Sequence, residues 1–167
     1  MEIKVTFFNQ LKMFIDLIVM TILFLILLFF INMADLKWGW FLLIFYLLIF
    51  FLPVLLLHIN YLKENKGSVF ILKSNTIVTK GNFETLNYSS EDIKRIIFFM
   101  NGSRGTVNGT LAFSNYYYAK IELLNRSSFV ITSLCSNKLD KILKENFEDV
   151  EIKTEKVFYP MIIKDGL

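Results

Sequence analysis

A long apolar stretch, Met13–Ile59, lies near the start of the chain and is interrupted by only a few polar residues. Its two charge-free runs are residues 17–34 and 38–62. A helix over residues 13–33 would span about 31 Å, close to the hydrocarbon thickness of a bilayer. Both runs are longer than the buried helices of soluble proteins usually are. The pattern therefore predicts two membrane-spanning helices, over residues 13–33 and 38–59.

Charged residues flank these two spans unevenly. Lys4 and Lys12 precede the first span and several lysines follow the second, whereas the short connecting loop carries only Asp35 and Lys37. Lysine and arginine in short flanking segments stay on the cytoplasmic side of a membrane. We therefore expect a multi-pass protein with both termini in the cytoplasm and the Asp35 loop outside.

Two ionisable side chains lie near the cytoplasmic ends of the predicted spans. Asp16 and His58 should differ in height by about 6 Å if the two helices run antiparallel. Ionisable groups inside a span can form a proton or ion site. Near a helix end, however, such groups can reach water at low cost. We favour an interfacial polar pair, with an ion site as the alternative.

After Leu62 the pattern changes to short apolar or alternating segments separated by turn residues. Strands are predicted at residues 69–73, 76–80, 83–88, 93–100, 116–124, 129–133 and 150–156. One helix is predicted before the last strand, because Leu139, Ile142, Leu143 and Phe147 recur at helical spacing. The expected fold is an α + β membrane protein. A transmembrane hairpin occupies residues 1–62, and a small antiparallel β-barrel or sandwich, capped by the late amphipathic helix, occupies residues 63–167.

Composition limits the chemistry that we expect. The net charge of +3 leaves no basic footprint for nucleic-acid binding. The chain has one histidine, His58 in the second span, and one cysteine, Cys135. A Ser-His-Asp or Cys-His catalytic site and a zinc site in the β-domain therefore lack their residues. We expect no enzyme activity, no cofactor and no metal.

Several segments of the β-domain resemble a known family. They are Tyr88–Ile97, Tyr118–Leu123, Phe129–Ser133, the late helix and Val150–Lys156. Together with the two spans, they resemble bacterial membrane proteins with a pleckstrin-homology-like (PH-like) domain. The resemblance implies a location in the bacterial inner (plasma) membrane, and it supplies no catalytic residues.

Three functions remain open from the sequence. The first is a protein-interaction or assembly module at the inner membrane surface, with a protein partner or a second copy contacting exposed Tyr116 and Tyr118. The second is binding of anionic lipid head groups. Eukaryotic PH domains bind them through basic residues around the first hairpin, where this chain has Lys66, Lys73 and Lys80. The third is an accessory subunit of a transporter.

Overall fold

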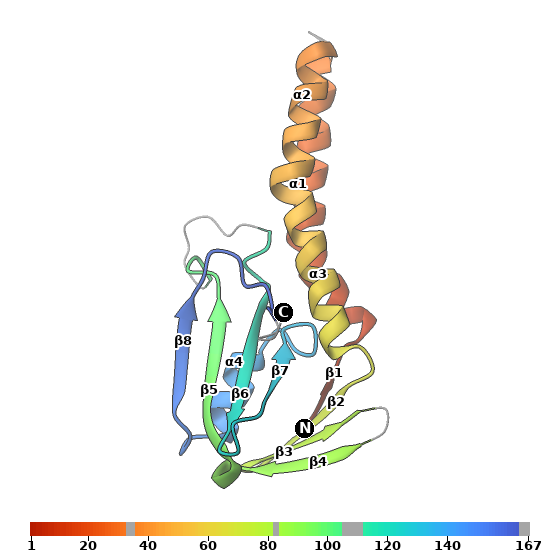
Figure 1. The fold of residues 1–167 in the computed structure, drawn as a ribbon. Helices are drawn as coiled ribbons and strands as arrows, with labels where there is room; N and C mark the ends of the chain where they lie inside the picture. The colour runs from red at the N-terminus through yellow and green to blue at the C-terminus, as the bar shows by residue number, and fades with distance from the viewer. Residues whose placement is uncertain (33–35, 82–83, 105–111, 164–167) are drawn as a thin grey trace.

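The computed structural model describes residues 1–32, 36–81, 84–104 and 112–163, so the expected Asp35 loop lies partly outside the described residues. A helical hairpin rises from two sheets (Figure 1). Its first arm is α1 (Phe7–Asn32). Its second arm consists of α2 (Leu36–Tyr46), a π-helical segment (Leu47–Phe51) and α3 (Leu52–Asn65).

The π-helical segment ends two residues before Pro53. Proline has no backbone N–H, so the regular helical hydrogen bond to the fourth residue before it cannot form. The second arm nevertheless continues past this point. Two stretches, Phe7–Phe30 and Trp38–Asn65, are long and apolar enough to cross a membrane. Both helices extend beyond the predicted spans at the end nearest the sheets.

Eight strands form two four-stranded sheets. The first sheet has the order β1-β2-β3-β4 and is antiparallel throughout. Its strands are β1 (Glu2–Lys4), β2 (Val69–Lys73), β3 (Thr76–Lys80) and β4 (Thr85–Ser89). The second sheet has the order β7-β6-β5-β8, with β8 parallel to β5. Its strands are β5 (Ile93–Met100), β6 (Tyr117–Leu123), β7 (Ser128–Thr132) and β8 (Ile152–Lys156). Seven of these strands begin within two residues of the start of a predicted strand.

The strand that the sequence analysis missed is β1. Glu2 pairs with Ile71 and Lys4 pairs with Val69, and the N-terminal amine donates a hydrogen bond to the carbonyl of Leu72. The whole helical hairpin is therefore the connection between β1 and β2. The predicted division at residue 62 leaves one strand of the sheet on the wrong side of the boundary.

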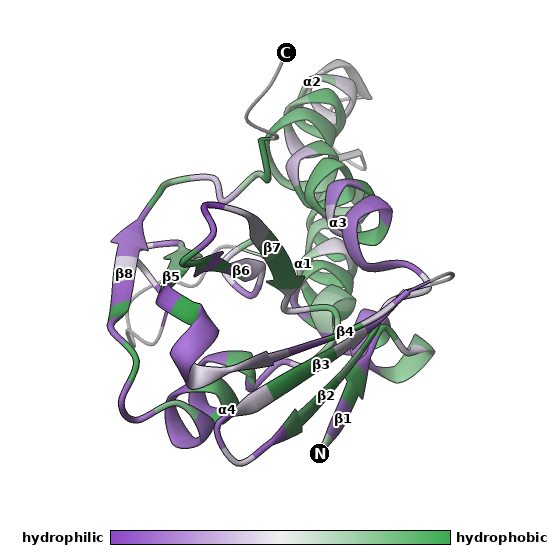
Figure 2. Cartoon of the chain, turned by 60° about the horizontal axis from the view of Figure 1, so that its bottom comes forward, coloured by the Kyte–Doolittle hydropathy of each residue, from purple (hydrophilic) through white to green (hydrophobic). Residues whose placement is uncertain are grey.

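The two sheets enclose a shared core, and α4 (Leu139–Asn146) lies across one end of it (Figure 2). Leu139 and Leu143 on α4 are buried against core residues of both sheets. The predicted amphipathic helix is thus confirmed, because its apolar stripe closes the opening between the sheets. The fold is α + β, with two long N-terminal helices, two four-stranded sheets and a late helix.

Candidate interaction site

The lower part of the helical hairpin is docked on the outer face of the second sheet. A second apolar cluster forms there, separate from the core between the sheets. The hairpin contributes Met13, Leu17, Val54, Leu57 and Tyr61, and the sheet side contributes Phe113, Tyr116, Tyr118, Leu134 and Ile162. The domain is therefore held against the helices by a core of its own.

Two asparagines of α3 bind the backbone of the domain. The Nδ2 of Asn65 donates to the carbonyl of Val130 at 2.9 Å, and its Oδ1 accepts from the N–H of Thr132 at 2.7 Å. Since β7 is an end strand, Asn65 takes the place of a neighbouring strand there. Asn60 makes the same kind of pair with Ile162, at 3.1 and 2.9 Å.

The predicted exposure of Tyr116 and Tyr118 is wrong. Their exposed fractions are 0% and 8%. The hydroxyl of Tyr116 lies 3.1 Å from Nδ1 of His58, and Tyr118 stacks on Phe99 at 4.8 Å between ring centroids. Burial raises the pKa of Tyr116 well above its ordinary value. These side chains face the docked helices, which a strand pattern by itself does not reveal.

Asp16 and His58 bind different partners. The carboxylate of Asp16 accepts a hydrogen bond from Nδ2 of Asn115. His58 lies between the Tyr116 hydroxyl and Oε1 of Gln10, the latter 3.2 Å from its Nε2. The predicted interfacial pair is therefore replaced by two separate polar contacts, both near the junction of helices and domain.

The three candidate lipid-binding lysines do not gather at one place. Lys80 pairs with Val69 at the start of β2, near Lys66, whereas Lys73 pairs with Thr76 at the opposite end. A five-residue strand separates these ends by about 13 Å. All three side chains are exposed. Because β1 joins the same sheet, β2 is an inner strand, and β2 and β3 form the first hairpin between β1 and β4.

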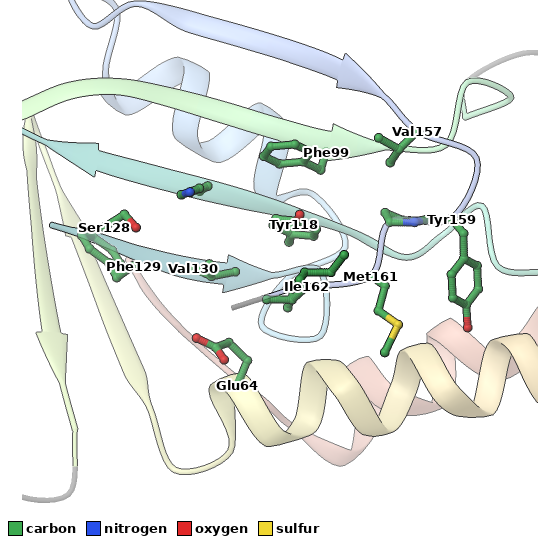
Figure 3. Close-up of a pocket in the computed structure, with 13 residues that line it drawn as sticks. Glu64, Phe99, Tyr118, Ser128, Phe129, Val130, Val157, Tyr159, Met161 and Ile162 are labelled. Carbon is green, nitrogen blue, oxygen red and sulfur yellow. The ribbon is translucent and has the colours of Figure 1, made fainter. Parts of the chain in front are cut away.

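A hollow of about 570 Å³ lies on the outer face of the second sheet, beside the end of α3 (Figure 3). Phe99, Tyr118 and Val130 form its floor, and Glu64 of α3 lies on one side. We call residues 157–163 the strap, and all of them except Phe158 form the opposite wall. The lining as a whole is aromatic and aliphatic, and Glu64 and Lys120 add charges of both signs. This composition is suited to a peptide more than to a single small ion.

A smaller hollow of about 280 Å³ follows the seam between the two sheets. Leu86 and Tyr88 of β4 line one side, and Phe129 and Val130 of β7 line the other. Tyr88 and Phe129 stack at 5.2 Å between ring centroids, which bridges the sheets beneath the hollow. Among the described residues, no strand pairs with the outer edge of β4 or of β7.

The backbone hydrogen bonds at the two ends of the β3–β4 ladder show which residues of β4 bond to β3 and which point outward. The N–H of Ser90 donates to the Asn75 carbonyl, and the N–H of Gly81 donates to the Glu84 carbonyl. Bonded and non-bonded pairs alternate along an antiparallel ladder. Leu86 and Tyr88 therefore bond to β3, whereas Thr85 and Asn87 direct their N–H and C=O groups away from it.

The described residues offer little for catalysis or metal binding. No group of three His, Cys, Asp or Glu side chains among them could hold a metal ion. Cys135 is buried, and burial raises the pKa of its thiol to about 12. A thiol in this setting is a packing group and a poor nucleophile at neutral pH.

The sequence analysis did not single out the asparagines that fasten the domain. Asn60 and Asn65 lie on the last turns of a helix whose other residues are mostly apolar. Uncharged polar residues in such a helix are a usable signal, because they need hydrogen-bond partners once they are buried. Ionisable groups alone, such as His58, do not mark these positions.

Comparison with known proteins assigns the family. A family model described as a PH domain matches residues 2–142, from β1 through the first half of α4 and including the helical hairpin. None of the curated proteins compared with the chain matches it. The family match covers well over half of the sequence and agrees with the two sheets and the late helix. The chain therefore belongs to the PH domain family, whose domains are generic interaction or lipid-binding modules.

Proposed function

We propose that the chain is a non-catalytic PH module that is anchored in the inner (plasma) membrane of a bacterium and binds a protein partner. Two helices long and apolar enough to span a bilayer support the anchor. The excess of lysines before the first helix and after the second supports a cytoplasmic location for both termini. The partner is another membrane-associated protein or a second copy of the chain.

The observation that carries this proposal is the open seam between β4 and β7. An extended segment that paired with β4 would accept hydrogen bonds from the outward N–H groups of Thr85 and Asn87 and donate hydrogen bonds to their C=O groups. Its side chains would enter the hollow lined by Leu86, Tyr88 and Phe129. Strand addition of this kind combines backbone hydrogen bonds, which give affinity, with side-chain pockets, which give specificity.

The edge strand β8 differs from β4 in a way that supports the choice. In β8, charged side chains at Lys153, Glu155 and Lys156 occupy most of the strand. Charged residues on an edge strand discourage pairing with another chain. The β4 sequence Thr-Leu-Asn-Tyr-Ser carries no charge. The edge strand β7, on the other side of the hollow, is also uncharged, but Asn65 already binds the backbone of its edge. The edge of β4 therefore has neither charged residues nor such a cap.

The short connection to the membrane helix favours partners at the membrane surface. Only three residues separate the end of α3 at Asn65 from the start of β2 at Val69. The module therefore cannot move far from the bilayer. Confinement raises the effective concentration of a partner held at the same surface, so a modest strand contact suffices for association.

A proline on the open edge tests this function. Because the N–H of Asn87 points away from β3, Asn87→Pro removes no hydrogen bond within the sheet but blocks strand addition. The matched control Asn87→Thr keeps the N–H. Full-length variants are expressed in their native membranes, cross-linked, and analysed for captured protein or dimer.

We expect Asn87→Pro to lower the captured protein or dimer at least tenfold and Asn87→Thr to leave it unchanged. Thermal unfolding of the purified variants checks that the sheet remains intact. Equal capture by both variants, or no captured protein or dimer with any of them, would overturn the proposal.

A further inference from the structure

The strap carries apolar side chains that are largely exposed. Phe158 is 76% exposed, and Met161 and Ile163 are 42% and 80% exposed. The backbone that carries them is nevertheless fastened. The carbonyl of Phe158 accepts a hydrogen bond from Nδ2 of Asn101 at 2.6 Å, and that of Pro160 accepts one from the Tyr61 hydroxyl at 2.7 Å. The exposure is a fixed property of the surface.

The strap meets the second helical arm at Pro53. The Tyr159 hydroxyl donates to the Pro53 carbonyl, and Figure 3 shows the Tyr159 ring pointing from the strap toward the helices. The ring of Phe113 lies 5.6 Å from that of Phe158 and 5.9 Å from that of Tyr159. We call Phe113, Phe158 and Tyr159 the aromatic rim.

An apolar groove of about 570 Å³ lies between this rim and the helices. Its helical side consists of apolar side chains such as Leu48, Leu52 and Leu56, which are also exposed on the flank of the hairpin. The groove is therefore continuous with the surface that lipid would contact if the hairpin spans a bilayer. Water gains almost no hydrogen-bond partners in such a place.

The length of the second arm places this rim at membrane depth. Trp38 is 63% exposed near the far end of the arm, where an aromatic belt marks the opposite interface. From Trp38 to Pro53 the arm rises by about 22 Å, whereas the hydrocarbon core is about 30 Å thick. Hydrocarbon thus extends about 8 Å further along the helix, past the point where Tyr159 binds. Any tilt of the hairpin increases this overlap.

We propose that the aromatic rim and the strap enter the near leaflet of the membrane, and that a phospholipid acyl chain fills the groove between the rim and the helices. This inference rests on the membrane-spanning part of the proposed function and not on the protein partner. The acyl chain is the occupant because the groove opens along the lipid-facing flank of the hairpin, at a depth where hydrocarbon is the surrounding medium.

Single-tryptophan fluorescence tests this depth. In a background with Trp38→Phe and Trp40→Phe, the full chain carries Phe158→Trp and is reconstituted in phosphatidylcholine vesicles brominated on the acyl chains. Leu27→Trp is the positive control, because Leu27 is exposed and lies in the half of α1 away from the sheets, where we expect the side chain to be surrounded by acyl chains. Leu124→Trp reports water, because Leu124 is 64% exposed and lies just beyond β6 at the end opposite Tyr117. Met161→Trp gives a second reading on the strap.

We expect the bromines to quench Phe158→Trp and Met161→Trp at least half as strongly as Leu27→Trp, and to leave Leu124→Trp unquenched. Strap tryptophans that behave like Leu124→Trp, while Leu27→Trp is quenched, would overturn the inference and leave the membrane anchor standing. Absence of quenching at Leu27→Trp as well would overturn the inference together with the anchor. Protein-partner binding is measured separately through the Asn87 variants.

Discussion

The two halves of the helical hairpin are built from the same kinds of apolar residue but have different surroundings. In the half beyond the sheets, side chains such as Leu27 and Ile44 are more than half exposed. In the half against the sheets, Val54, Leu57 and Tyr61 have no exposed surface. Apolar composition therefore identifies a helix that avoids water, but it does not tell whether lipid or protein covers each turn.

The two halves also differ in how they are held together. In the far half, Tyr46 of the second arm stacks on Phe24 of the first at 4.2 Å between ring centroids, and its hydroxyl lies 2.6 Å from that of Thr21. In the near half, a buried cluster and the paired hydrogen bonds of Asn60 and Asn65 join the helices to the domain. The near half is thus part of the globular domain in its packing.

Truncation of a buried leucine should show this difference most strongly. Leu57→Ala removes a fully buried side chain from the junction cluster and is expected to lower the free energy of unfolding by about 3 kcal/mol. The matched Leu27→Ala, at a position 51% exposed, should cost well under about 1 kcal/mol. Thermal or denaturant unfolding in detergent micelles measures both. Equal losses would remove the distinction between the halves.

Removal of the Asn65 side-chain amide should have an intermediate effect. Asn65→Ala leaves the Val130 carbonyl and the Thr132 N–H without their partner at the end of β7, at a cost of about 2 kcal/mol. Amide hydrogen exchange at Thr132 should accelerate in the variant. Asn60→Ala serves as the comparison, since its bonds reach the strap instead of a strand. Unchanged exchange at Thr132 would show that the edge of β7 does not depend on α3.

The smallest expected effect concerns the polar contact in the far half. Thr21→Val deletes the hydroxyl that meets Tyr46 while it keeps the side-chain shape. Hydrogen bonds between helices in a membrane average about 0.6 kcal/mol, so we expect a loss of that size in unfolding free energy. A double-mutant cycle with Tyr46→Phe isolates the pair. A coupling energy of zero would leave stacking of Tyr46 on Phe24 as the main link there.

Much of the architecture could be predicted from local pattern. The long apolar runs, the alternating strands and the stripe on α4 are periodic signals that depend on near neighbours in the chain. The strand β1 could not be found in this way, because three residues give too short a pattern and their partner, β2, is separated from them by the entire hairpin. The candidate site was harder still. Tyr116 and Tyr118 were predicted to be exposed, although docked helices cover them.

The sequence by itself determined that two helices avoid water and that strands with a late helix follow. These elements can be recognised because the hydrophobic pattern of a helix or strand depends only on residues that are close together in the sequence. Tertiary structure alone decided that the hairpin interrupts the first sheet between β1 and β2. It also decided which apolar turns face the domain, and that Asn65 completes the edge of β7. These outcomes depend on contacts between distant segments, and the free energy of each contact exists only once both segments are in place.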